Sequence, residues 1–346
     1  MGHTIDSIPG GEPSRATPAE IVGGKSVMVA GGAGFIGSHL CDALLAAGAS
    51  RVVAVDDLFL GRRENLEDAF AVGGDARFRF EEQDASDIEG MRRLIGDERP
   101  EIVFNLAVIP LPTSLERPKF TVDRNVSIAS TMCELARDEA YPTLLAFSSS
   151  EAYGTARSVP MDETHPLEPR TPYAASKAAS DLTVMSCVHS FGIDARILRP
   201  FNNFGPRQND RAYAGIIPIV VRRVEAGEPV VIYGDGEQTR DFIYAADTAD
   251  AAIRLVGCPA ARGRITNIGR GTETSINDLV ITLLDVLGVP NHPIEYADDR
   301  PGDVRRHCAG IDQARRLIDF APRTELRRGL EETVAWYRAR PLPTSR

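Results

Sequence analysis

Tyr173 and Lys177 are the residues whose types and spacing point most directly to chemistry. They are four residues apart in a helix-like run, so both side chains should lie on one helix face. A lysine ammonium beside a phenol favours the phenolate, and we expect it to lower the pKa of Tyr173 from about 10. Such a phenolate can take the proton of a hydroxyl group while a hydride leaves the same carbon. Ser149, which follows an apolar run, could share a hydrogen bond with that hydroxyl.

A Tyr-x-x-x-Lys pair alone usually lies on a solvated helix face, but this chain also has a glycine-rich stretch, GGAGFIG at 31–37. The stretch links a strand-like run to a helix-like run. Gly31 permits a tight turn, Gly34 lets the backbone approach a diphosphate, and Gly37 lets the helix pack closely on the strand. The free N–H groups at the start of the helix then face the anion. The residues expected to hold a dinucleotide here are Gly31, Gly34, Phe35, Ile36 and Gly37.

An acidic residue follows at the distance that a dinucleotide site requires. Asp56 ends a second apolar run, 51–55. Its carboxylate can accept both hydroxyls of an adenosine ribose and repels a 2′-phosphate, so the sequence predicts NAD rather than NADP. Arg62 and Arg63 could reach a cofactor phosphate, although surface arginines are the commoner interpretation. A glycine turn that binds nothing is disfavoured by this combination of strand, turn, helix and acid.

Strand-like and helix-like runs alternate along the first 200 residues. This alternation predicts an α/β fold of Rossmann type, in which right-handed βαβ units build a doubly wound parallel sheet. Asp84 follows one of the strands and should lie on the face where such sheets bind ligands. The expected strands are 26–30, 51–55, 77–82, 102–107, 144–147 and 195–198, and the expected helices are 35–48, 89–95, 121–138 and 172–190.

The pattern loosens after residue 200, where the chain becomes rich in Asn, Gly and Pro. We expect this part to form a smaller C-terminal α/β lobe over the carboxyl ends of the strands, with a substrate cleft between the two parts. Its expected elements are helices at 216–225, 247–256, 276–287 and 326–338 and a strand at 230–234. The predicted organisation is a flexible tail (1–24), a Rossmann domain (25–200) and a mainly substrate-binding lobe (201–340).

Composition narrows the functional classes. The formal net charge of −10 argues against nucleic acid or an anionic membrane as a partner. No apolar run is long enough to span a membrane, and residues 1–24 lack the apolar core of a signal peptide. The five cysteines are scattered and form no Cys-x-x-Cys pair. They are typical of reduced thiols in a cytoplasmic protein, so we expect neither disulfides nor a metal site.

Taken together, these motifs resemble the extended short-chain dehydrogenase/reductase family, in particular its NAD-dependent nucleotide-sugar epimerases and dehydratases. The resemblance covers nearly all of the chain beyond the tail and is specific for the family, though not for a member of it. Besides the glycine-rich stretch and Asp56, the matching segments are 105–107 (NLA), 148–154 (SSSEAYG), 172–177 (PYAASK), 199–207 (RPFNNFGPR), 234–242 (GDGEQTRDF) and 300–303 (RPGD).

The resemblance implies roles for residues around the cofactor. Ser149, Tyr173 and Lys177 would be catalytic, and Tyr173 and Lys177 would also contact the nicotinamide ribose side of NAD. Asp84 would meet the adenine, and Ala107 would line the cofactor site. The implied chemistry is oxidation at C4 of a sugar, which gives a 4-keto intermediate while the protein orients and protonates the reactants.

The resemblance also implies a binding site for the diphosphate of a nucleotide sugar. Asn202, Arg240 and Arg300 occupy the matching positions. Arginine suits this role because its guanidinium group binds phosphate in a bidentate manner. The alternative for each is a turn asparagine or a surface arginine.

The fate of the 4-keto intermediate depends on few residues, among them Glu151. In simple 4-epimerases of the family this position is usually small and neutral, whereas in 4,6-dehydratases and uronate decarboxylases it is typically Glu. A ketone at C4 acidifies H5, and a nearby carboxylate can abstract that proton so that water leaves from C6. Typical hexose dehydratases place Asp before this Glu, whereas this chain has Ser150. Glu151 could instead serve only as a helix cap or in a salt bridge.

Two C-terminal segments bear on the same choice. The decarboxylases have an Arg-Lys-Pro stretch where this chain reads RHCA at 306–309, and the RPGD segment at 300–303 is similar to that of the epimerases. We therefore favour an NDP-hexose 4,6-dehydratase over an NDP-sugar 4-epimerase of the UDP-glucose 4-epimerase kind, and place UDP-glucuronate decarboxylase third.

A protein of another class, a non-catalytic NAD-binding module, would need no proton relay, so the set of Ser149, Tyr173 and Lys177 argues against it. The resemblance further implies a homodimer in which helices 121–138 and 172–190 pair. These helices carry more apolar positions than one core stripe requires, namely Val126, Ile128, Met132, Leu182, Val184 and Met185.

Overall fold

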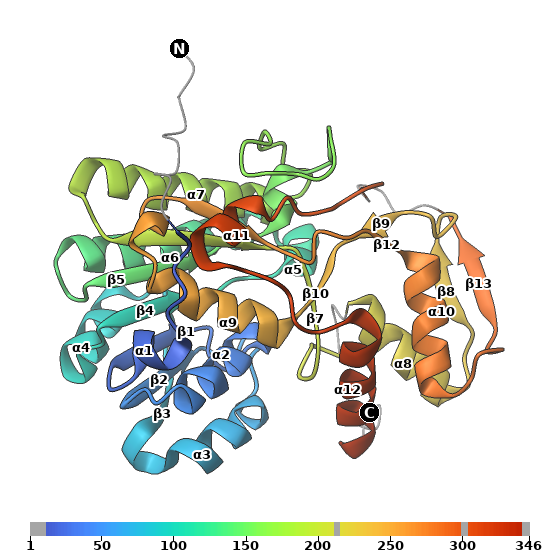
Figure 1. Cartoon of the computed structure of the whole chain (residues 1–346), viewed down its shortest axis with the longest axis horizontal. Coiled ribbons are helices and arrows are strands. Elements are labelled where there is room, and N and C mark those ends of the chain that lie inside the picture. The colour runs from blue at the N-terminus through green and yellow to red at the C-terminus, as the bar shows by residue number, and fades with distance from the viewer. Residues whose placement is uncertain (1–11, 211–214, 299–303, 341–346) are drawn as a thin grey trace.

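The computed structural model describes residues 12–210, 215–298 and 304–340. A seven-stranded parallel sheet with the strand order β11-β6-β5-β4-β1-β2-β3 lies at its centre (Figure 1). The direction of winding reverses between β1 and β4, and the predicted Rossmann-type α/β fold is confirmed. The strands are β1 (Ser26–Ala30), β2 (Arg51–Asp56), β3 (Phe78–Glu82), β4 (Ile102–Asn105), β5 (Thr143–Phe147), β6 (Ala195–Pro200) and β11 (Ile265–Ile268).

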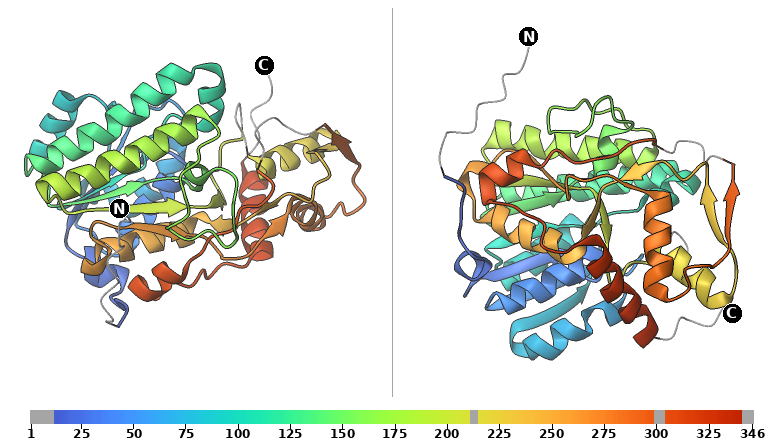
Figure 2. Two further views of the ribbon diagram at one scale, coloured as in Figure 1. Left: turned by 90° about the horizontal axis from the view of Figure 1, so that it is seen from above. Right: turned by 45° about the vertical axis from the view of Figure 1, so that its right-hand side comes forward.

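Helices cover both faces of this sheet, so its strands are buried on both sides and alternate residues enter two separate cores. Val27 and Val29 of β1 pack into one core with Leu40, whereas Met28 and Ala30 pack into the other. The first core is closed by α2 (Phe35–Ala46), α3 (Glu67–Arg77) and α9 (Ala245–Val256). The second is closed by α4 (Ile88–Glu98), α6 (Pro118–Arg137) and α7 (Pro172–Phe191), and the last two lie side by side in Figure 2.

The smaller lobe has a hydrophobic core of its own, in which Val220, Ile232, Leu283 and Leu330 are buried together. It lies beside the large sheet, at the right of Figure 1. Its main elements are α8 (Ile216–Ala226), β8 (Val230–Tyr233), α10 (Ile276–Leu287), β13 (Ile294–Ala297) and α12 (Leu326–Ala339). Short strands join it to the sheet, namely β7 (Asn202–Phe204), β9 (Thr239–Arg240), β10 (Phe242–Tyr244) and β12 (Thr274–Ser275).

The structure corrects the predicted division at residue 200. Strand β11 pairs with β6 as the seventh strand of the large sheet, α9 packs on α2, and α11 (Asp312–Ile318) packs on β11 and α9. The chain thus returns to the Rossmann part after β10 and leaves it again for the smaller lobe. The sequence did not reveal this because β11 is a short strand of four residues, which carries little periodic signal.

Residues 1–11 of the predicted flexible tail lie outside the described residues, and the prediction is wrong for residues 18–22. Residues 18–22 form α1 (Pro18–Val22), which begins with a capping box between Thr17 and Glu20. Ile21 and Val22 are buried in the first core, and α1 packs on α9. A helix of five residues is too short to show a hydrophobic period, so only the cap residues could have indicated it.

Most other elements lie where they were expected, with ends that differ by a few residues. The predicted strand at 77–82 starts at Phe78, because Arg77 ends α3. Helices α3 and α5 (Leu111–Glu116) were not predicted. Among the described residues, no helix is long and apolar enough to cross a membrane.

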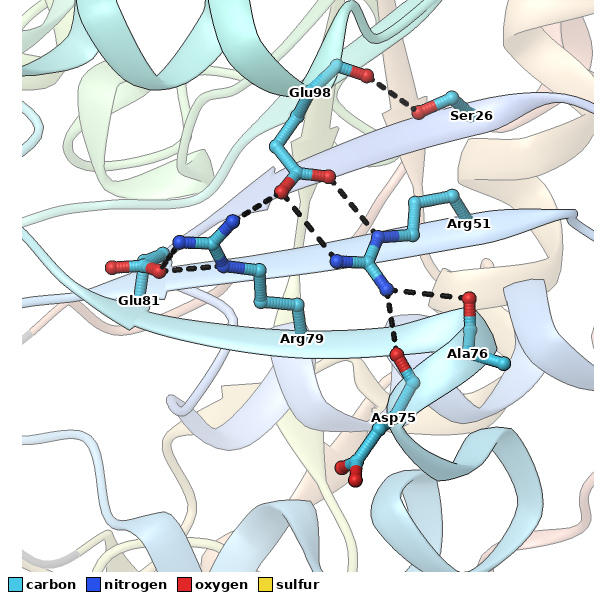
Figure 3. Close-up of polar contacts among 7 residues, drawn as sticks. All are labelled: Ser26, Arg51, Asp75, Ala76, Arg79, Glu81 and Glu98. Carbon is cyan, nitrogen blue, oxygen red and sulfur yellow. Dashed lines mark hydrogen bonds and ion pairs between the residues drawn. The ribbon is translucent and has the colours of Figure 1, made fainter.

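A cluster of charged side chains joins the amino ends of the sheet strands (Figure 3). Glu98, the last residue of α4, forms ion pairs with Arg51 at the start of β2 and with Arg79 in β3. Arg79 also pairs with Glu81, and the Ser26 hydroxyl donates to the Glu98 carbonyl oxygen. This cluster, called the amino-end cluster below, lies at the end of the sheet away from the carboxyl edge, where α/β folds bind ligands.

Candidate active site

The glycine-rich stretch forms the turn between β1 and α2, as predicted. Gly31 has a φ of +80°, and a Cβ there would lie 2.7 Å from the Ala107 nitrogen. A Cβ on Gly37 would overlap the Gly31 carbonyl oxygen. Among the described atoms, a Cβ on Gly34 would meet only that same oxygen, at 3.1 Å. Gly31 and Gly37 are therefore required by the protein's own packing, whereas the space beside Gly34 is open to a ligand.

Asp56 ends β2 beside this turn, and its carboxylate accepts hydrogen bonds from the N–H groups of Ala33 (3.1 Å) and Leu58 (2.9 Å). Burial raises the pKa of Asp56 to about 6, and these hydrogen bonds oppose the rise. The structure thus brings Asp56 to the glycine turn, as the sequence predicted.

A cavity of about 340 Å³ follows the carboxyl ends of the central strands, and we call it the first cavity. It lies at the point between β1 and β4 where the winding reverses, the usual ligand position in such folds. The predicted residues that line it are Gly31, Gly34, Phe35, Ile36, Gly37, Asp56, Asp84, Ala107, Ser149, Tyr173 and Lys177.

These residues fit a dinucleotide cofactor. The start of α2 presents backbone N–H groups beside Gly34, where a diphosphate can approach without meeting a side chain. The Asp56 carboxylate lies farther along the same cavity, where it can accept ribose hydroxyls. Arg62 and Arg63 point to other partners: Arg62 forms an ion pair with Asp210 (2.7 Å), and Arg63 lies over the Phe80 ring. Their suggested contact with a cofactor phosphate therefore has no support in the structure.

Asp84 lines the first cavity, and its carboxylate is engaged by neighbouring residues. Its carboxylate pairs with Arg124 at 2.7 Å and accepts hydrogen bonds from the N–H and hydroxyl groups of Ser86. Arg124 lines the same cavity. The ion pair therefore forms part of the wall at the end where the resemblance places the adenine.

Helix α7 positions Tyr173 and Lys177. Thr171 caps the helix by accepting from the Ala174 N–H at 3.1 Å, and Pro172 is its first residue, so Tyr173 lies in the first turn. The Tyr173 hydroxyl is hydrogen-bonded to Ser149, which follows β5. The predicted set of Ser149, Tyr173 and Lys177 is thus brought together in one cavity.

The pKa of Tyr173 is not lowered, as was expected, but raised. Burial raises the pKa of Tyr173 to about 12, although the hydrogen bond with Ser149 opposes the rise. The Lys177 ammonium donates to the Phe147 carbonyl oxygen, and burial lowers its pKa to about 8. Spacing along a helix predicts that two side chains share a face, but it does not predict the hydrogen-bond partner of each side chain.

Glu151 lies on η2 (Ser150–Tyr153), a short 3-10 helix that Ser149 caps by accepting from the Glu151 N–H at 3.3 Å. The Glu151 carboxylate is close enough to Tyr173 for its charge to raise the pKa of that phenol. Glu151 does not line the first cavity. Its position is therefore beside the phenol, outside the part of the site where the cofactor would lie.

A second cavity, of about 360 Å³, lies in the smaller lobe between α8, β8 and β10. Asn202 and Arg240 line it, together with Arg223 and Gln238. The side-chain oxygens of Asn202 and Gln238 are buried without a hydrogen-bond partner among the described residues. Arg300, the third predicted diphosphate ligand, lies outside the described residues.

Other residues at the site were not predicted one by one. Phe201 and Asn203 line the first cavity from the segment that follows β6, and Gln83 lines it from the end of β3. The first two belong to the 199–207 segment, so the motif indicated the segment but not which side chains reach the cavity. Within the described parts of the chain, no three His, Cys, Asp or Glu side chains gather as they would around a metal ion.

Comparison with known proteins agrees with this geometry. Residues 27–269 match the model of the NAD dependent epimerase/dehydratase family. The chain is 35% identical to a UDP-glucose 4-epimerase of Mycolicibacterium smegmatis over 313 residues, which are 90% of this chain and 98% of that protein. It is also 35% identical to a dTDP-glucose 4,6-dehydratase of Streptomyces griseus over 315 residues, 90% of this chain and 93% of the relative.

Among solved structures, the dTDP-glucose 4,6-dehydratase of Streptomyces venezuelae with NAD bound matches with a TM-score of 0.84 and 32% identity, and the match covers 91% of this chain and 97% of that one. The family model spans most of the chain, and relatives of similar length exceed 30% identity along almost their whole sequence. The chain therefore belongs to the NAD-dependent epimerase/dehydratase family of the extended short-chain dehydrogenases/reductases, and it is an enzyme that uses NAD.

Proposed function

We propose that the enzyme is an NDP-hexose 4,6-dehydratase that acts through a 4-keto intermediate. The observation that carries this proposal is the place of Glu151 beside Tyr173, where the carboxylate charge acts on the phenol. A dehydratase needs a second proton acceptor close to the group that serves C4, because its next step removes the proton at C5. A 4-epimerase needs no such group.

The first step oxidises C4 of the sugar. NAD, when bound, accepts the hydride, later returns it, and contributes the positive charge of its nicotinamide ring. Tyr173 takes the proton of the C4 hydroxyl, and Ser149 holds that hydroxyl through a shared hydrogen bond. Because burial keeps the Tyr173 phenol protonated, its conversion to the base requires nearby positive charge. Lys177, one helical turn away in the same cavity, is the source within this chain.

The second step is the elimination. The Glu151 carboxylate takes the C5 proton, a C5–C6 double bond forms, and the C6 hydroxyl leaves as water once it is protonated. Typical dehydratases have an Asp before this Glu, and here that residue is Ser150. A serine hydroxyl is a much weaker acid than a carboxylic acid, so Glu151 would itself give the proton to the leaving group. The hydride that left C4 is then added to C6, and a proton from solvent, delivered through Glu151, is added to C5, while Tyr173 releases the proton that it took from the C4 hydroxyl to solvent. This gives the 4-keto-6-deoxy product.

The second cavity is our proposed site for the nucleotide part of the substrate. Asn202 and Gln238 supply buried oxygens without hydrogen-bond partners among the described residues, and such groups are costly unless a ligand or water satisfies them. Arg240 and Arg223 add positive charge for a diphosphate. Arg300 remains a proposed third ligand of the diphosphate on the strength of the family motif alone.

A homodimer through α6 and α7 remains part of the proposal. Three of the six apolar positions that suggested it, Ile128, Met132 and Val184, are buried in the protein's own core. Leu182 remains 63% exposed on α7, and Phe191 at the end of the same helix is 57% exposed. These two side chains form the apolar part of the proposed contact. All five cysteines are free, which fits the cytoplasmic location that we propose.

A 4-epimerase is the second candidate, because the chain is equally similar to the M. smegmatis epimerase and the S. griseus dehydratase. The two reactions differ in product mass. We would incubate the purified enzyme with UDP-, dTDP-, GDP- and CDP-hexoses and with UDP-glucuronate, and follow the products by mass spectrometry. Loss of water from one hexose substrate supports the dehydratase. An unchanged mass with a new retention time supports the epimerase, and loss of carbon dioxide supports the decarboxylase.

A further inference from the structure

Asp181 lies one helical turn beyond Lys177 on α7, so Tyr173, Lys177 and Asp181 follow a single stripe of the helix at four-residue spacing. The Asp181 side chain is almost completely buried and forms an ion pair with Arg199 of β6 at 2.7 Å. The Ser148 hydroxyl donates to the same carboxylate oxygen, Oδ2, at 2.5 Å. The carboxylate is therefore held by two partners, Arg199 and Ser148, one helical turn beyond Lys177 on α7.

Arg199 has little freedom to move away from this carboxylate. Its Nε donates to the Ser148 hydroxyl oxygen at 3.3 Å, and its guanidinium group lies 4.3 Å from the centre of the Tyr153 ring. Tyr153 is anchored in turn, because its hydroxyl donates to Asn267 at 2.9 Å. Only 1% of the Arg199 side chain is exposed. The orientation of the pair is thus set by β5, β6 and η2 together.

The described charged groups that act on Lys177 are few. Asp181 favours its ammonium form, and Arg199 and the burial of Lys177 oppose it. Tyr173, on the turn before, carries no charge while its phenol is protonated, and the Glu151 charge acts on that phenol. Asp181 is therefore the one anion, among these described groups, that offsets two buried cations.

We propose that Asp181 is a positioning residue that keeps Lys177 in its cationic form at the working pH, and that Arg199 and Ser148 hold the Asp181 carboxylate in place for this purpose. A neutral Lys177 would lose its charge toward Tyr173 and its ability to donate three hydrogen bonds. The inference rests on the roles of Tyr173 and Lys177 within the proposed function. It is the same for a dehydratase and for an epimerase, because both begin with oxidation at C4.

The sequence allows a direct test, because the chain has only three lysines, Lys25, Lys119 and Lys177. We would label the lysine side chains with ¹³C at Cε and follow their three NMR signals as the pH is raised. The variants Lys25→Arg and Lys119→Arg assign the Lys177 signal by elimination and leave the site untouched. The titration needs no substrate, so it stands whether or not the proposed dehydration is found.

Removing the Asp181 anion and removing the Arg199 cation should shift the pH midpoint of the Lys177 titration in opposite directions. In the parent enzyme we expect a midpoint near pH 8. Asp181→Asn removes the anion and should lower the midpoint by about one pH unit or more. Arg199→Gln removes the competing cation and should raise it by a similar amount, and the double variant should return toward the parent value. If Asp181 and Arg199 had only a structural role, the Lys177 midpoint would shift in the same direction in both single variants or would not shift in either.

Two outcomes would overturn the proposal: a folded Asp181→Asn variant in which Lys177 titrates as in the parent, or single variants that shift it in the same direction. Where Asp181→Asn does not fold, the double variant is compared with Arg199→Gln instead, since both lack the Arg199 cation. The midpoint must then be lower in the double variant, and equal midpoints refute the inference. With an active substrate in hand, the alkaline limb of kcat should move with the Lys177 midpoint in each variant.

Discussion

Arginine–carboxylate clusters stand at both ends of the large sheet, and they differ in burial. In the amino-end cluster, Glu98 joins Arg51 and Arg79, whose side chains are 25% and 43% exposed. At the carboxyl end, Asp181 and Arg199 expose only 4% and 1% of their side chains. The first cluster is partly exposed, so water screens its charges, whereas the second lies within the protein, one helical turn from Lys177, the proposed catalytic lysine.

This difference in burial determines how strongly each cluster can influence a reacting group. A partly exposed pair contributes little to stability and its field is weak at a distance, because water and salt screen it. A buried pair costs free energy to desolvate, and its field reaches neighbouring groups almost unscreened. The ion pair with the larger desolvation penalty, Asp181–Arg199, thus lies one helical turn from Lys177. The partly exposed pairs lie at the opposite end of the sheet, where we expect no reaction.

The largest effect should come from the site itself. Tyr173→Phe removes the hydroxyl that we propose takes the proton of the C4 hydroxyl group, so kcat should fall by about 10²–10⁴-fold. The stability of the fold should change little, because the phenyl ring remains in place. Steady-state kinetics and thermal unfolding of the same preparation check both parts. Near-parental turnover in this variant would remove Tyr173 from its assigned role.

A smaller effect, on stability, is expected from breaking the buried pair. Asp181→Asn leaves the Arg199 guanidinium buried without its anion, and the free energy of unfolding should fall by about 3–5 kcal/mol. Urea unfolding measures the change. Salt should have little influence on it, because the pair is shielded from solvent. A loss below about 1 kcal/mol would mean that the two clusters are energetically alike.

The amino-end cluster should give the smallest effect. Glu98→Gln removes the acceptor shared by Arg51 and Arg79, yet both arginines keep access to water and Arg79 keeps Glu81. We expect a loss of about 1 kcal/mol or less, which shrinks further as salt is added. Activity should match the parent enzyme, since this cluster does not touch the cavities. A change in kcat would show that the amino end does influence the reaction.

Much of the fold could be predicted because its signals are local. The apolar runs of β1 and β2 and the turn at 31–37 specify a strand, a turn and a helix from neighbouring residues alone. The return of β11 to the large sheet could not be foreseen, since strand order is set by long-range pairing. Helix α1 also depends on long-range contacts, because it is buried against α9, more than 200 residues later in the chain, and it was therefore not predicted.

The site divides in the same way. Glycine positions, Asp56 and the Tyr173–Lys177 spacing follow from requirements that sequence expresses directly. The pKa of Tyr173 was misjudged because burial, which spacing cannot reveal, raises it. Asp181 and Arg199 were not singled out, because β5, β6 and α7 must first pack together before the pair exists.

The central claim, that Glu151 takes the C5 proton in a dehydration, is tested most directly by turnover in deuterated water. With the substrate identified by the nucleotide-sugar panel, the parent enzyme should release a product that carries solvent deuterium on carbon. Glu151→Gln keeps the shape but removes the proton acceptor, and product formation should fall by about 10²–10⁴-fold. A product without carbon-bound deuterium, together with an active Glu151→Gln variant, would contradict the dehydratase and establish the 4-epimerase in its place.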